Sequence, residues 1–86
     1  MAREKRARRI DVRMYGTLWP ADGGSFPVTV LDLSARGFRI EVQEPLAVGE
    51  RVRLGIGNKD VADAAIKWVL GREAGGTFIG AVPDLA

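Results

Sequence analysis

Short runs of alternating apolar and polar residues, separated by turns rich in glycine and proline, make up most of this 86-residue chain. Such alternation is typical of half-buried β-strands. The runs with this pattern are 10–19, 26–33, 38–42, 51–56, 61–70 and 77–82, and the turns between them include 20–25, 57–60 and 71–76. Because so short a chain can bury few open sheet edges, the pattern predicts an all-β fold and favours a small barrel over a sandwich.

The run 61–70 is the least regular of these segments, because its alanines also suit a helix. We interpret it as a strand, since Ile66, Trp68 and Leu70 alternate with other residues. A large ring in a small barrel belongs in the core, and we expect this of Trp68 and of Trp19. The alternative for Trp68 is an exposed indole that stacks on a base.

The basic residues gather at the start of the chain. Residues 1–13 contain Arg3, Lys5, Arg6, Arg8, Arg9 and Arg13 against two acidic residues, whereas the net charge of the whole chain is only +2. Residues 1–9 show no apolar periodicity, so we expect a basic leader that stays flexible until it binds an anion, followed by a single domain over 10–83. A solvated basic tail fits the same composition.

The chain has no cysteine and no histidine. Disulfides and thiolate metal sites are therefore excluded, and the commonest general base is missing. No apolar run is long enough to span a membrane, and we expect no signal peptide, because the start of the sequence is charged with no apolar run behind it. We expect a cytoplasmic protein that is not an enzyme, holds no cofactor or metal and does not insert into membranes.

A polar cluster follows the second run, at Asp32-Leu33-Ser34-Ala35-Arg36-Gly37. Residues two apart share a face of a strand, so Asp32 and Ser34 are expected side by side where the strand ends. Gly37 allows a tight turn or the close approach of a ligand or another backbone. These residues suit a polar ligand, but taken alone they favour a hairpin whose side chains bond to turn amides.

Leader and cluster together resemble the PilZ domain family, whose members carry Arg-x-x-x-Arg before the first strand and (Asp/Asn)-x-Ser-x-x-Gly after a later one. Asp32, Ser34 and Gly37 match the second motif. The first motif is matched in one of two registers, Arg9 with Arg13 or Lys5 with Arg9. The second register places Ile10 at the start of the strand, as in the family, and Arg6 or Arg8 then compensates for the lysine.

The resemblance implies a six-stranded antiparallel β-barrel that binds the bacterial second messenger cyclic di-GMP. In such a site, leader arginines take phosphate oxygens and guanine O6/N7, Asp32 accepts from guanine N1–H or its amine, Ser34 bonds to the ligand edge and Gly37 leaves room for it. It also implies a downstream protein partner, with the domain a monomer or a homodimer. The alternatives are a PilZ-like adaptor that binds no nucleotide, and a small barrel that binds RNA or single-stranded DNA through its leader. Few aromatics and an acidic body argue against nucleic acid.

Overall fold

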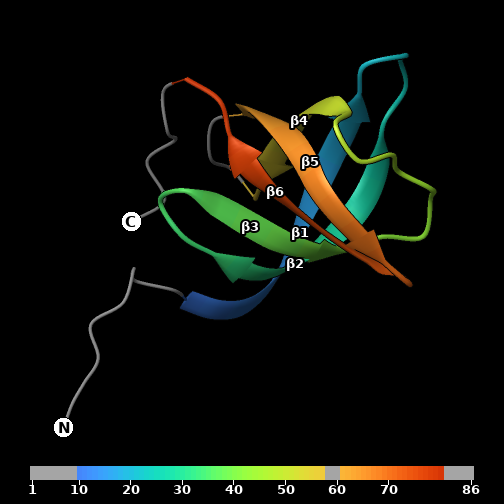
Figure 1. Cartoon of the computed structure of the whole chain (residues 1–86). Coiled ribbons are helices and arrows are strands. Elements are labelled where there is room, and N and C mark those ends of the chain that lie inside the picture. Colours follow the sequence, from blue (N-terminus) through green and yellow to red (C-terminus); the bar gives the residue numbers. More distant parts are fainter. Residues whose placement is uncertain (1–9, 58–60, 81–86) are drawn as a thin grey trace, which may run out of the picture.

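The computed structural model describes residues 10–57 and 61–80, which form six strands and no helix. The strands are β1 (Ile10–Pro20), β2 (Phe26–Leu33), β3 (Gly37–Glu41), β4 (Arg51–Ile56), β5 (Ala62–Leu70) and β6 (Glu73–Phe78). All neighbours pair antiparallel and close into a barrel in the order β1-β2-β3-β6-β5-β4 (Figure 1). The predicted six-stranded antiparallel barrel is confirmed. Among these residues no helix has the length and hydrophobicity needed to cross a membrane.

The barrel interior is filled by apolar side chains at alternating strand positions. The largest that are fully buried are Leu18, Val30, Ile40, Leu54 and Ile66. Closure pairs every strand on both sides, which removes the open edges that a small sheet cannot otherwise cover. The predicted strands 10–19, 26–33, 38–42, 51–56 and 61–70 agree with β1 to β5 to within one residue at each end.

The prediction for the last strand is wrong. β6 begins at Glu73, so Gly75 and Gly76, which were expected in a turn, lie inside a strand. Aromatic rings occupy the space that side chains at these glycines would take: Phe38 on the inner side of Gly76 and Trp68 on the outer side of Gly75. Glycine here makes room for neighbouring rings rather than for a turn. Residues 81 and 82 of the predicted strand lie outside the described residues.

A β-bulge in β2 redirects the polar cluster. Ile40 of β3 pairs with Val30. Its neighbour Arg39 pairs with Asp32 rather than with Leu31. Leu31 is therefore an extra residue, and an extra residue reverses the alternation of the side chains that follow it. As a result Leu33 joins the core cluster, and Asp32 points to the outer face beside β3.

A second bulge lies in β5, where Lys67 is the extra residue between Ile66 and Trp68. Ile66 is fully buried, but Trp68 is 39% exposed and lies on the outer face. Trp19 is 37% exposed and lies over Gly55 of β4 in a similar way. The expectation that both tryptophans belong to the core is therefore wrong.

Candidate functional site

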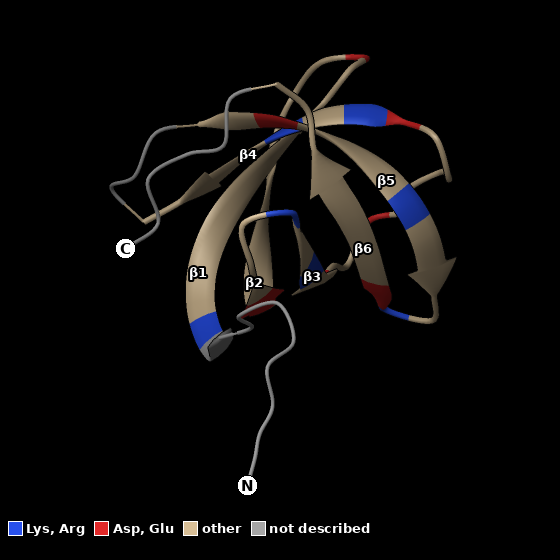
Figure 2. Ribbon diagram, turned by 60° about the vertical axis from the view of Figure 1, so that its left-hand side comes forward, with Lys and Arg blue, Asp and Glu red and all other residues tan. Residues whose placement is uncertain are grey.

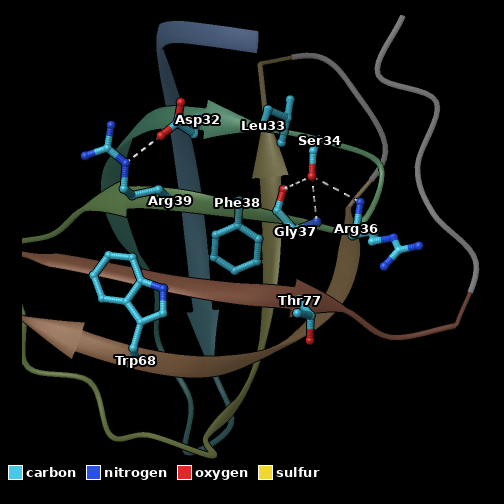
Figure 3. Close-up of a pocket in the computed structure, with 9 residues that line it drawn as sticks. All are labelled: Asp32, Leu33, Ser34, Arg36, Gly37, Phe38, Arg39, Trp68 and Thr77. Carbon is cyan, nitrogen blue, oxygen red and sulfur yellow. Dashed lines mark hydrogen bonds and ion pairs between the residues drawn. The ribbon is translucent and has the colours of Figure 1, made fainter. Parts of the chain in front are cut away.

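An open cavity of about 300 Å³ lies on the outer face of the barrel, across β2, β3, β6 and β5. Its walls are Asp32, Leu33, Ser34, Arg36, Gly37, Phe38, Arg39, Trp68 and Thr77 (Figure 3). Asp32, Ser34 and Gly37, the residues predicted for a ligand site, thus line one cavity together with Trp68. The cavity lies in the size range of small-molecule sites, at its lower end.

Strand register places Asp32 and Trp68, which are far apart in the sequence, on one row. Asp32 pairs with Arg39, Arg39 pairs with Gly75, and Gly75 pairs with Trp68. Gly75 has no side chain, so the indole of Trp68 lies across β6 toward the arginine, as Figure 3 shows. A carboxylate, a guanidinium and an aromatic ring are therefore presented side by side by three different strands.

Arg39 is held from both sides by carboxylates. Its Nε donates to Asp32 Oδ2 at 2.6 Å, and its Nη1 donates to Glu73 Oε1 at 2.9 Å. The hydrogen bond to Asp32, followed by that to Glu73, raises the pKa of Arg39 above its ordinary value. Asp32 is only 5% exposed, so its carboxylate forms the base of this arrangement and Arg39 its more accessible part.

Ser34 closes the turn between β2 and β3. Its Oγ accepts hydrogen bonds from the backbone N–H of Arg36 and of Gly37, both at 3.2 Å, and its own N–H donates to the Gly37 carbonyl oxygen at 2.9 Å. The hairpin interpretation is therefore right for Ser34, which bonds to turn amides. The carboxylate of Asp32 binds Arg39.

Replacing Ser34 with alanine is expected to lower the free energy of unfolding by about 1 kcal/mol, because two turn amides lose their acceptor. The measurement is urea unfolding followed by tryptophan fluorescence. Ser25→Ala is the matched control, since that exposed serine lies in the turn between β1 and β2. Equal stability of the two variants would show that the hydroxyl of Ser34 does not hold the turn.

Gly37 lets β3 approach β6 closely. A Cβ there would collide with the carbonyl oxygen of Gly76. Of the two uses expected for this glycine, the structure therefore shows the close approach of another backbone. Its backbone also lines the cavity.

The leader joins the barrel at this site. Ile10, the first residue of β1, pairs with Leu33 in the middle of the motif. Arg9 and the other predicted leader residues, Lys5, Arg6 and Arg8, lie outside the described residues. Arg13 lies exposed on β1 and does not line the cavity.

Arg39 is the site residue that sequence reasoning missed. The sequence carries a signal for it, since Asp32 and Arg39 flank a short turn, and an antiparallel hairpin closed by that turn places them opposite each other. An aspartate opposite an arginine beside a motif turn is thus recognisable once the hairpin register is fixed.

The same residues lie within a match to a known protein family. The chain matches the family model described as PilZ domain over residues 3–82. No curated protein matches the chain significantly. The family match covers nearly the whole chain, including the closed barrel and the turn that carries Asp32, Ser34 and Gly37, and the protein therefore belongs to the PilZ domain family.

Proposed function

We propose that this protein is a receptor for cyclic di-GMP, bound between the basic leader and the cavity that holds Asp32 and Trp68. PilZ domains are a known family of cyclic di-GMP receptors, and they act as ligand-binding adaptor domains rather than as enzymes. The observation that carries the proposal is the convergence of the motif residues, Trp68 and the start of β1 on one open cavity.

The cavity suits one guanine end of the ligand. A base stacks on the exposed indole of Trp68, a contact available to any aromatic base. Arg39 lies in the same row, with β6 between it and Trp68. Its guanidinium can pair there with guanine O6 and N7 or with a phosphate. Asp32 and Glu73 hold that guanidinium in place, so part of the site is ordered before the ligand arrives.

The leader supplies the remaining positive charge. In the proposed complex Arg9, with Lys5, Arg6 or Arg8, binds the phosphates from the open side of the cavity. The position of Arg13, outside the cavity lining, supports the register in which Arg9 is the second basic residue of the motif. Ser34 and Gly37 form the turn against which the ligand edge lies.

The test is a calorimetric titration of the full chain with cyclic di-GMP, with GMP as the control ligand. We expect saturable binding to cyclic di-GMP alone. Asp32→Ala removes the carboxylate that holds Arg39, and Arg9→Ala removes a phosphate contact, so each is expected to weaken binding about tenfold. Arg72→Ala is the matched control, because this exposed arginine lies outside the cavity lining.

Two outcomes would contradict the proposal or part of it. The absence of binding heat at high concentrations of cyclic di-GMP would contradict the receptor function. The remaining hypothesis would then be an adaptor that binds no nucleotide. Binding lost in Asp32→Ala but kept in Arg9→Ala would show that the leader register is wrong. Thermal denaturation of each variant separates loss of binding from loss of the fold.

A further inference from the structure

A second exposed aromatic cluster lies on the outer face of β1 and β4. It surrounds a cavity of about 280 Å³, the aromatic groove, lined by Tyr15, Gly16, Thr17, Trp19, Gly55, Gly57 and Val61. Tyr15 is 83% exposed. The ring of Trp19 lies over Gly55, where a Cβ would come within 3.1 Å of the indole. The groove therefore has two aromatic walls and a floor with little side-chain cover.

This groove is separate from the site around Asp32. The two cavities share no lining residue. In the closed strand order, β4 is opposite β3 and β1 is opposite β6 (Figure 1). An inference drawn from the groove therefore goes beyond the proposed nucleotide binding and does not depend on it.

A second hollow adjoins the groove at Trp19. It is lined by Arg51 and Arg53 of β4 and by one acidic residue, Asp63. Arg53 and Asp63 are 3.5 Å apart and both are well exposed, an arrangement that contributes little stability and leaves the guanidinium available to another carboxylate. Within the described ranges Arg51 makes no ion pair.

Charge divides the barrel into two halves. The strands β1, β4 and β5 carry four basic residues against two acidic ones, whereas β2, β3 and β6 carry three acidic residues against one basic residue. Figure 2 shows the basic segments on β1 and β5 and the acidic end of β6. The half of the barrel that contains the aromatic groove therefore carries a net positive charge on its strands.

We propose that the aromatic groove is a docking surface for a partner protein, which inserts an apolar side chain between Tyr15 and Trp19 and presents carboxylates to Arg51 and Arg53. Tyrosine, tryptophan and arginine are the residue types that carry most of the binding energy in protein interfaces. Arg51 and Arg53 of the adjoining hollow favour an acidic partner through charge complementarity. Two arginines are too few to follow the phosphates of a nucleic acid strand, which argues for a protein.

The test is selection of a random dodecapeptide phage library on the immobilised full chain, followed by fluorescence anisotropy with the selected peptides. We expect the selected peptides to combine an apolar residue with Asp or Glu. Tyr15→Ala and Arg51→Glu are each expected to weaken their binding about tenfold or more. Binding is expected to persist in Asp32→Ala, which distinguishes this surface from the nucleotide site.

The controls match each substitution. Leu70→Ala removes a similar exposed apolar side chain, 76% exposed, from the end of β5, and Arg72→Glu reverses a charge in the β5–β6 turn. Both are expected to bind the peptides as the unaltered protein does. The proposal is overturned if no acidic peptides are enriched, or if the control variants lose binding equally. The proposal would also be overturned if no peptide were selected and the protein instead bound a labelled 15-nucleotide oligo-dT in a way that Tyr15→Ala weakens.

Discussion

Replacing Gly76 with alanine is expected to lower the free energy of unfolding by about 3 kcal/mol, the upper part of the range for overpacked cores. The added Cβ would lie 2.7 Å from Cζ of Phe38 and closer still to the carbonyl oxygen of Ala65. The phenyl ring is part of the packed core, and the carbonyl belongs to the neighbouring strand β5. Neither can move without disturbing the barrel. A loss of this size takes a large part of the stability of a small domain.

The measurement is urea unfolding, with the melting temperature as a second readout that is expected to fall by about 15 °C. Gly55→Ala is the matched control, because it makes the same change in a strand where the Cβ would meet the Trp19 ring at 3.1 Å. An exposed ring can shift, so we expect the control to lose less than half as much. Equal losses of stability in the two variants would mean that the collision with Phe38 and Ala65 does not cause the effect at Gly76.

Replacing Trp68 with alanine is expected to weaken cyclic di-GMP binding by about tenfold to hundredfold, because stacking of a base on an aromatic ring is worth about 1–3 kcal/mol. The expectation rests on the proposed function and on the position of the ring in the cavity, across β6 from Arg39. Trp68→Phe keeps a smaller stacking surface and is expected to recover part of the affinity. Calorimetric titration measures the affinity of the unaltered protein and of both variants for cyclic di-GMP.

Trp19→Ala is the matched control for this experiment. Trp19 is as exposed as Trp68 and also lies over a strand glycine, but it lines the aromatic groove instead. We expect it to leave cyclic di-GMP affinity unchanged while lowering stability about as much as Trp68→Ala. If both variants bound the nucleotide as well as the unaltered protein, the base would not stack on Trp68.

Most of the fold can be predicted from sequence because most of the strands alternate regularly. β2 and β4 match their predicted bounds, and the motif turn at Ser34 lies where its polar residues indicate. The motif also brings Asp32, Ser34 and Gly37 to one cavity, as their short spacing suggests. Local pattern is sufficient where side chains simply alternate between core and solvent.

The rest depends on contacts between distant segments. Gly75 and Gly76 read as turn residues, and only the rings of Phe38 and Trp68 explain why they lie in a strand. The bulge at Lys67 leaves no mark in the apolar alternation of β5, so a regular pattern places Trp68 inside the barrel. The partner of Asp32 likewise follows from the register between β2 and β3, which a single extra residue alters.

The two bulges make the candidate site a matter of strand pairing as much as of residue identity. Each of them supplies one extra residue, Leu31 or Lys67, just before a residue that lines the cavity. If either strand paired without its bulge, regular alternation from Val30 or Ile66 would turn Asp32 or Trp68 toward the core, where burial of an unpaired carboxylate is unfavourable. The outward position of both side chains therefore depends on how β2 and β5 pair with their neighbours. The pairing register of these two strands is thus a property that selection for this site would act upon.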